Sequence, residues 1–217
     1  MLINIKYINR LKSSYSIIKF EIYSHICSLI GIVKSRLFFH DNEVNKLEIG
    51  VGSSARKDGF ITSDINLKTN FPFDLRLGLP FPDHSIDFIY AEHVLEHFDY
   101  NDLRVLLKDC HRVLKSNGTM SIVVPNANIY LTAYFQPKEF EFKKYCLHDF
   151  GLSYKHKIDY VNYIFYMGGH HRYMFDEESI LMILKEEGFH NVQLRDFDPN
   201  LDHLVRKYES IYVIAAK

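Results

Sequence analysis

The stretch Leu47–Asp64, LEIGVGSSARKDGFITSD, decides the fold because it joins two strands through a glycine turn. The apolar strand Leu47–Gly50 runs into a Gly-x-Gly turn, and a second strand over Phe60–Asp64 ends in a carboxylate. In a doubly wound sheet the ligand lies beyond the carboxyl ends of the strands, where glycines let the backbone approach it and a carboxylate accepts ribose hydroxyls. About a dozen residues separate the turn from Asp64, too few for a full crossover helix and a strand. The turn therefore predicts a nucleotide-like cofactor and disfavours a pyrophosphate, which binds at the N-terminus of a proper helix.

The composition indicates one globular domain. The 217 residues suffice for a sizeable core. The formal net charge of -1 gives no general attraction for a polyanion, so a nucleic-acid partner is not expected. Cys27, Cys110 and Cys146 form no CxxC pair, which indicates reduced thiols and a cytoplasmic protein. No compact apolar block ends at a small-residue cleavage site, so no secretory signal is expected.

Residues 1–45 predict an amphipathic helical extension that precedes a domain over residues 46–217. Hydrophobic side chains recur at three- and four-residue steps on one helix face: Leu11, Tyr15, Ile18, Ile22, Ile26, Leu29, Val33 and Leu37. The polar positions are mostly basic. We expect the apolar face to pack on the domain, and the alternative is attachment to an anionic membrane surface or to a partner. The longest apolar patch, Ile26–Val33, is expected to be too short and too interrupted to span a bilayer.

The rest of the chain alternates strands with helices. Further strands are expected over Ile86–Ala91, Thr119–Val124, Val192–Phe197 and Ser210–Ala216, with helices over Asn101–Leu114 and from an N-cap at Asp176 to Gly188. This alternation predicts an α/β fold with a parallel sheet.

An aromatic-rich segment, residues 126–173, interrupts the alternation and is expected to be an irregular substrate lid. Six of its rings would either stack on an acceptor or fill the lid's own core: Tyr130, Tyr134, Phe135, Tyr163, Tyr166 and Tyr173.

The stretch Phe73–Phe98, FDLRLGLPFPDHSIDFIYAEHVLEHF, together with LEIGVGSS, resembles the class I S-adenosylmethionine-dependent methyltransferases. The resemblance is closest to a small group met among sugar- and polysaccharide-modifying enzymes. The segments CHRVLKSNGTMSIVVPN (Cys110–Asn126), HRYMFDEESILMILKEEGF (His171–Phe189) and SIYVIAAK (Ser210–Lys217) are similar to the same family. The resemblance implies a Rossmann-like, seven-stranded, mostly parallel sheet with helices on both faces.

The resemblance also implies which residues bind S-adenosylmethionine. Around the methionine part of the cofactor it places Glu48, Gly50, Gly52 and Ser53, and at the ribose hydroxyls Asp64 with Ile65 beside it. Asp74 and Leu75 would border the adenine, with the carboxylate facing the exocyclic amine. Ala91, Glu92 and His93 would lie near the sulfonium and the acceptor.

Methyl transfer from a sulfonium is an in-line displacement, so the protein must align the acceptor and exclude water. A hydroxyl acceptor also requires a base, and histidine suits that role near neutral pH. The candidates are His93, His97, His170 and His171, each of which could instead be structural.

A divalent metal ion is the alternative use of these histidines. The spacing His93-x-x-Glu96-His97, completed by His171, is similar to the Glu-x-x-Glu-His metal motif of ubiquinone-pathway O-methyltransferases and small-RNA 2′-O-methyltransferases. Mixed imidazole and carboxylate ligands suit zinc, manganese or iron better than magnesium.

The sequence leaves the acceptor open. The favoured interpretation is O-methylation of a small polar acceptor in glycan or polysaccharide biosynthesis. The alternatives are a lipid- or quinone-like acceptor, which the basic N-terminal helix favours, and a non-catalytic partner subunit that binds the cofactor.

Overall fold

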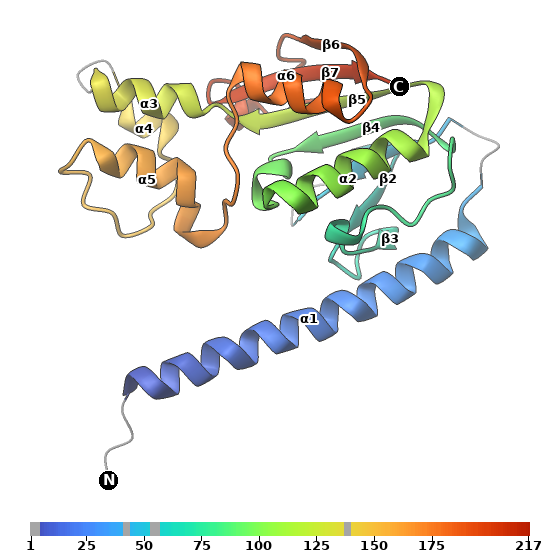
Figure 1. Ribbon diagram of the computed structural model, residues 1–217, viewed down its shortest axis with the longest axis horizontal. Helices are drawn as coiled ribbons and strands as arrows, with labels where there is room; N and C mark the ends of the chain where they lie inside the picture. Colours follow the sequence, from blue (N-terminus) through green and yellow to red (C-terminus); the bar gives the residue numbers. More distant parts are fainter. Residues whose placement is uncertain (1–4, 41–43, 53–56, 137–139) are drawn as a thin grey trace.

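The computed structural model describes residues 5–40, 44–52, 57–136 and 140–217. In these residues seven strands form one sheet in the order β3-β2-β1-β4-β5-β7-β6 (Figure 1). Side chains are described from residue 14 onward, except that of residue 142. The strands are β1 (Lys46–Ile49), β2 (Phe60–Asp64), β3 (Phe71–Pro72), β4 (Ile86–Glu92), β5 (Leu114–Pro125), β6 (His190–Leu194) and β7 (Ser210–Ala216). Strands β1 to β5 pair in parallel, and β7 is antiparallel to β5 and β6. The predicted, mostly parallel α/β sheet is confirmed.

The helices begin and end near their predicted positions outside the aromatic-rich segment. They are α1 (Ile5–Phe38), α2 (Tyr100–Val113), α3 (Ala127–Phe135), α4 (Phe142–Tyr145), α5 (Ile158–Tyr166) and α6 (Glu177–Glu186). Asp99 caps α2, and Asp176 caps α6 in a reciprocal pair with Ser179. Helix α2 ends at Val113, one residue before the predicted end, and the following segment Ser116–Gly118 lies within β5.

The main core lies between one face of the sheet and helices α2 and α6 (Figure 1). Leu106 of α2 and Ile180 of α6 are fully buried there. On the other face, Tyr90 of β4 packs with Phe197 and Leu201 of the β6–β7 connection. Helices were expected on both faces, but within the described ranges this connection covers the second face. The short turn between β1 and β2 leaves no room for a crossover helix on that side.

The described part of residues 126–173 contains three α-helices, α3, α4 and α5, joined by non-helical stretches such as residues 146–157, so the segment is less irregular than expected (Figure 1). Helices α3 and α5 pack together around Tyr130 and Tyr163, whose rings stack with centroids 5.9 Å apart. The Tyr130 hydroxyl donates to the carbonyl of Tyr145. Aromatic burial therefore stabilises this helical insertion as a small core of its own.

Helix α1 contacts the domain at β3, the edge strand of the sheet (Figure 1). The apolar face that was expected to pack on the domain is exposed, and that expectation is wrong: Ile22 and Leu29 are 57% and 65% exposed. Within Ser14–Phe38 an 18-residue window reaches a mean hydropathy of 1.4, so this stretch is long and apolar enough to cross a membrane by length and composition. The expectation of a patch too short to span is therefore also wrong, because the helix continues through Gly31.

Candidate active site

A cavity of about 920 Å³ lies at the carboxyl ends of β1, β2 and β4. Eight of the ten residues expected to bind the cofactor line it: Glu48, Gly50, Gly52, Asp64, Ile65, Asp74, Leu75 and Glu92. Ala91 is buried and is not among the lining residues. Ser53 lies outside the described residues. The position at the strand ends is where ligands bind in open α/β sheets.

The glycine turn holds the backbone close to Val94 and to β2. Gly50 has a φ of +67°, and a Cβ atom at this position would lie 2.4 Å from a methyl group of Val94. The amide of Gly50 donates to the carbonyl of Ser63, which ties the turn to the end of β2. Only glycine fits here, because a side chain would meet both a left-handed backbone and the buried Val94.

Asp64 is fixed to the same turn. Its Oδ2 atom accepts from the amide of Gly52 at 2.6 Å, and Asn66 Nδ2 donates to the Gly52 carbonyl at 3.2 Å. The carboxylate is therefore held at the cavity wall beside the turn. This arrangement fits a ribose whose hydroxyls donate to a carboxylate.

Asp74 lines the cavity but is already engaged by its own chain. Arg76 donates to both carboxylate oxygens, and the Ser24 hydroxyl of α1 donates to Oδ2. Burial raises the pKa of Asp74, but the hydrogen bonds from Arg76 and Ser24 outweigh it and hold the pKa below its usual value. The contact with an adenine amine stays a prediction, and the amine would have to share an oxygen that Arg76 or Ser24 already binds.

Two buried or half-buried glutamates lie on the cavity wall. Glu48 accepts from the amide of Lys57 at 3.4 Å, and burial raises the pKa of this carboxyl. Glu92, at the end of β4, accepts from the backbone amide of His203 at 3.0 Å and from its ring Nδ1. Both carboxylates face the cavity and could bind the ammonium group of the cofactor.

A smaller cavity of about 210 Å³ holds the histidines, and His93, His97, His170 and Arg206 line both cavities. The site therefore combines the cofactor turn with the candidate bases.

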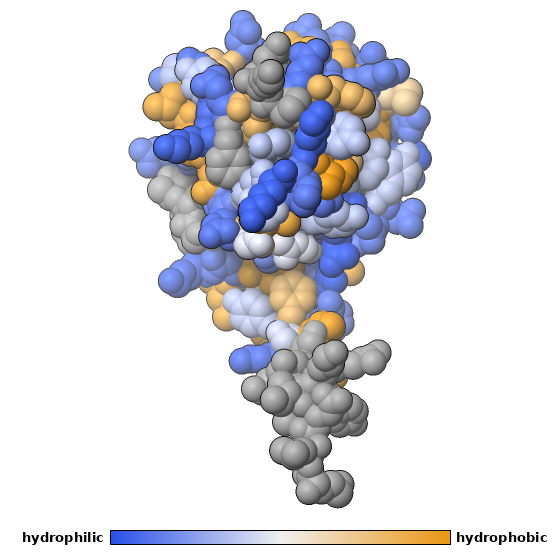
Figure 2. All heavy atoms as spheres, turned by 90° about the vertical axis from the view of Figure 1, so that its left-hand side faces the viewer, coloured by the Kyte–Doolittle hydropathy of each residue, from blue (hydrophilic) through white to orange (hydrophobic). Residues whose placement is uncertain are grey.

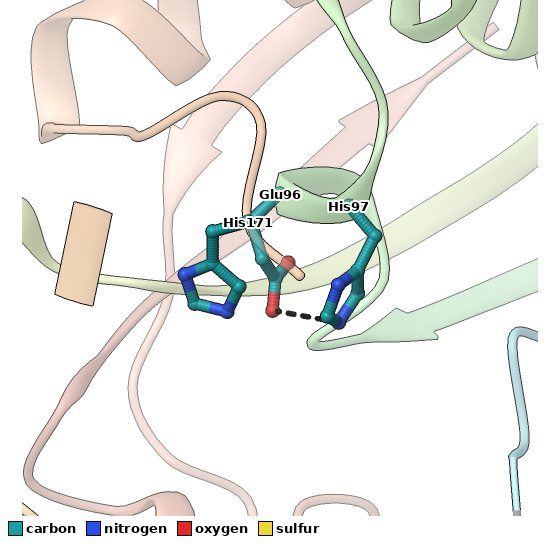
Figure 3. Close-up of side chains that lie close together, drawn as sticks. All are labelled: Glu96, His97 and His171. Carbon is teal, nitrogen blue, oxygen red and sulfur yellow. Dashed lines mark ion pairs between the residues drawn. The ribbon is translucent and has the colours of Figure 1, made fainter. Parts of the chain in front are cut away.

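Glu96 is fully buried at the centre of the histidine cluster (Figure 3). Its Oε1 atom lies 3.5 Å from His93 Nδ1 and 3.9 Å from His97 Nε2. Among the described residues neither carboxylate oxygen has a hydrogen-bond partner. Burial raises the pKa of Glu96 to about 8. A buried carboxyl without partners is costly, so this group is expected to be neutral or to bind a ligand.

The backbone fixes the proton positions on two of the histidines. His97 Nδ1 lies 3.0 Å from the carbonyl of His170, and His171 Nδ1 lies 2.6 Å from the carbonyl of Ile164. A carbonyl only accepts, so each Nδ1 bears the proton and each Nε2 keeps a lone pair. One ligand atom from each of Glu96, His97 and His171 lies within 4.8 Å of the others.

Burial keeps the cluster neutral. It lowers the pKa of His93 well below its usual value, lowers that of His97, and lowers that of His171 to about 4. His93 is held by a 2.8 Å contact between its Nε2 and the hydroxyl of Ser210. His97 is the most accessible of the three, with 43% of its side chain exposed.

Sequence reasoning missed lining residues from distant segments. Phe20 comes from α1, and His203 and Arg206 come from the β6–β7 connection. His203 meets Glu92 across 111 positions of sequence. No local pattern marks these residues, because only the antiparallel return into β7 brings their segment over the cavity.

The six aromatic residues singled out in the insertion line neither of these two cavities. Tyr130 and Tyr163 are buried in the insertion's own core, whereas Phe135 and Tyr166 are exposed. The insertion instead contributes His148, Phe150 and Met167 to the smaller cavity. The expectation that these rings form the acceptor pocket therefore finds no support in the two cavities.

A family model described as a methyltransferase domain matches residues 14–194. The chain is similar to a SAM-dependent methyltransferase from Archaeoglobus fulgidus, with 19% identity, a TM-score of 0.49, and coverage of 86% of this chain and 93% of that chain. It is also similar to a SAM-dependent methyltransferase from Thermotoga maritima, with 15% identity, a TM-score of 0.46, and coverage of 96% and 97%.

A protein from Nostoc punctiforme PCC 73102 is 11% identical with a TM-score of 0.50, over 86% of this chain and 55% of that chain. This likeness concerns the fold alone. No curated protein matches the sequence.

The family model covers most of the chain, including the glycine turn, Asp64 and the histidine cluster. The family and the enzyme class predicted from the stretch Phe73–Phe98 are thereby confirmed, and the sugar-modifying subgroup stays a prediction. The chain belongs to the class I S-adenosylmethionine-dependent methyltransferases.

Proposed function

We propose that the protein transfers the methyl group of S-adenosylmethionine to a hydroxyl of a small polar acceptor, such as a sugar of a glycan or polysaccharide precursor. The observation that supports this most is the position of His97, which lines both cavities and whose Nε2 keeps its lone pair because Nδ1 donates to the His170 carbonyl. The walls around it include the polar side chains of His170, Arg172, His203 and Arg206 beside apolar ones. The charged and hydrogen-bonding groups suit a hydroxylated or anionic acceptor better than a quinone-like one.

The bound cofactor supplies a methyl group that is already activated on a sulfonium. The protein's part is to align the acceptor oxygen, exclude water and accept the hydroxyl proton. His97 is neutral at pH 7 because burial lowers its pKa. Its Nε2 can take the proton, while the Nδ1–H bond to the His170 carbonyl holds the ring and stabilises the imidazolium.

His93 and His171 fit a positioning role. The Nε2 atom of His93 is in contact with Ser210, and His171 is buried with its Nδ1 on the Ile164 carbonyl. Each ring is fixed by a protein partner before any acceptor binds.

The test is transfer of a radiolabelled methyl group to panels of saccharides, nucleotide sugars, lipid-linked sugars and quinones. His97→Gln should lower kcat on the true acceptor by about 100-fold or more while cofactor affinity holds. His190→Gln, an exposed histidine of β6, is the matched control. Wild-type turnover by His97→Gln, or transfer to quinones alone, would contradict this proposal.

A divalent metal ion is a second candidate for the cluster of Glu96, His97 and His171, and the unpartnered carboxylate of Glu96 is the observation that favours it. Two imidazoles and a carboxylate are a donor set for zinc, manganese or iron. The backbone bonds from both Nδ1 atoms are typical of metal-binding histidines, because they orient the other nitrogen. An ion there would hold adjacent oxygens of the acceptor.

The Nε2 atom of His97 can serve as base or as metal ligand, and metal content separates the two roles. The purified protein would be analysed for zinc, manganese and iron, and its thermal unfolding midpoint measured with added ions. If the metal is bound, Glu96→Gln and His171→Gln lose both the metal and the thermal shift, whereas His190→Gln keeps them. A metal-free protein with no thermal shift leaves His97 as the base.

A further inference from the structure

Helix α1 differs from an ordinary surface helix because its small and polar side chains face the domain, whereas its apolar side chains face outward. The buried positions of its described part are Ser24, Cys27, Ser28, Gly31 and Ser35. A Cβ atom at Gly31 would lie 2.2 Å from the carbonyl oxygen of Pro72, so glycine allows a close approach to β3. The side that meets the protein therefore buries little apolar surface.

Polar contacts fasten this inner side to the domain. Ser24 donates to the carboxylate of Asp74, and the Ser28 hydroxyl accepts from the Asp74 amide at 3.1 Å. Glu21 and Arg76 form a pair with two hydrogen bonds of 3.0 and 2.9 Å. These contacts fix the orientation of the helix, and with it the direction of the outer side.

The outer face of α1 is a continuous apolar stripe, made of Tyr15, Ile18, Ile22, Ile26, Leu29, Val33 and Leu37. Their exposed fractions run from 46% for Ile26 to 70% for Tyr15. Figure 2 shows hydrophobic side chains at the surface on the stretch of helix that follows the grey residues. Contiguous exposed apolar surface of this extent marks a binding site for a membrane or another protein.

Charge distinguishes between these occupants. Helix α1 contains six lysines and arginines and a single acidic residue, Glu21, which is paired with Arg76. On the helical spacing, Lys19 and Arg36 lie beside the apolar stripe, where their stems can pack on it while the charges stay in water. Two copies meeting through this face would bring like charges together, whereas an anionic bilayer complements them.

We propose that the outer face of α1 docks on the surface of an anionic lipid bilayer, with the helix lying in the plane of the interface. The helix could also cross a membrane by length and composition, but crossing would require the contacts of Glu21, Ser24 and Ser28 with the domain to break. Lying in the interface keeps them all and buries the stripe among the acyl chains. The inference does not depend on which acceptor is methylated.

A single tryptophan tests both the docking and its depth, because the chain contains no tryptophan. Ile26→Trp places the probe on the outer face, at the middle of Ser14–Phe38. The matched control is Met182→Trp, at a residue of α6 that is 53% exposed. The full-length variants would be mixed with phosphatidylglycerol or phosphatidylcholine vesicles whose lipids have bromine either near the headgroup or deep in the acyl chain.

Docking in the interface predicts that fluorescence of Ile26→Trp shifts to shorter wavelength on phosphatidylglycerol and is quenched more by shallow than by deep bromine. The shift on phosphatidylcholine should be weaker, and Met182→Trp should not respond. Stronger quenching by deep bromine would overturn the proposal in favour of a spanning helix, which would place residue 26 at the bilayer centre. No response to either vesicle would also overturn it.

Charged substitutions on the stripe give a second, independent measurement. Ile22→Glu with Leu29→Glu should lower the fraction that sediments with phosphatidylglycerol vesicles at least tenfold, whereas Met182→Glu should sediment as the wild type does. Retained S-adenosylmethionine binding shows that the double variant is folded. Equal sedimentation of wild type and double variant, or a wild-type dimer that this variant abolishes without any vesicle binding, would refute membrane docking.

Discussion

Replacing Gly50 by alanine should destabilise the protein more than the same change at Gly52. Both glycines have left-handed backbones, with φ of +67° and +57°. A Cβ at Gly50 would lie 2.4 and 2.5 Å from the two methyl groups of Val94, whereas a Cβ at Gly52 would have no atom of the described residues within 4 Å. Val94 is only 5% exposed, so its methyl groups cannot move into solvent.

The left-handed conformation costs an alanine about 1–2 kcal/mol at either position. Overpacking against a buried side chain adds about 1–3 kcal/mol at Gly50 alone. The free energy of unfolding should therefore fall by about 2–5 kcal/mol in Gly50→Ala and by about 1–2 kcal/mol in Gly52→Ala. At about 2–4 °C per kcal/mol for a protein of this size, Tm should fall by about 4–20 °C and about 2–8 °C respectively.

These free-energy costs would be measured by denaturant unfolding of Gly50→Ala, Gly52→Ala, Val94→Ala and the double variant Gly50→Ala with Val94→Ala. Shortening Val94 removes the steric conflict, so the double variant should be more stable than the sum of its single changes by about 1–3 kcal/mol. Equal costs at the two glycines, or additive effects of Gly50→Ala and Val94→Ala, would refute the packing argument for the turn.

Two other predictions concern the core. Asp202 is buried and accepts hydrogen bonds from Arg195. Burial raises the pKa of Asp202, but the hydrogen bonds outweigh burial and lower the pKa overall. The stabilisation is therefore present above about pH 3.9 and is lost as the pH falls through the folded-state pKa. Asp202→Asn should lower the free energy of unfolding by about 3 kcal/mol at pH 7, measured by urea titration, and a wild-type value would contradict this. Burial raises the pKa of Cys27 and Cys110, and that of Cys146 to about 12, so a thiol reagent at pH 7 should modify all three rapidly only after denaturation; rapid modification of the native protein would show that burial does not protect them.

The sequence predicted the sheet well because its strands are marked locally. The strand at Phe60–Asp64 and the last strand, Ser210–Ala216, were predicted with their observed bounds. Strand β3, Phe71–Pro72, has only two residues and shows no period. The periodicity of α1 revealed an apolar stripe, but a period cannot tell which side packs. Because Ser24 and Glu21 make polar contacts with the domain, the polar side of α1 packs on it and the apolar side is exposed.

In the candidate site too, residues of one short motif could be predicted, whereas contacts between distant segments could not. Gly52 and Asp64 lie within one short motif, and the hydrogen bond from the Gly52 amide to the Asp64 carboxylate follows from that local geometry. The engagement of Asp74 by Ser24 joins positions 50 residues apart, and no short motif encodes it. Arg206 reaches the cavity through the β6–β7 connection, so its place depended on the tertiary fold.

The central claim, that the glycine turn and Asp64 hold the cofactor, is tested most directly by calorimetric titration of S-adenosylmethionine into the wild type, Asp64→Asn and the exposed control Asp58→Asn. Asparagine at position 64 can still accept from the Gly52 amide, but it replaces one carboxylate oxygen with a donor that cannot accept from a ribose hydroxyl. We predict affinity about 10–100-fold weaker for Asp64→Asn, with an unchanged Tm, and wild-type affinity for Asp58→Asn. Wild-type affinity in a folded Asp64→Asn protein would contradict the account.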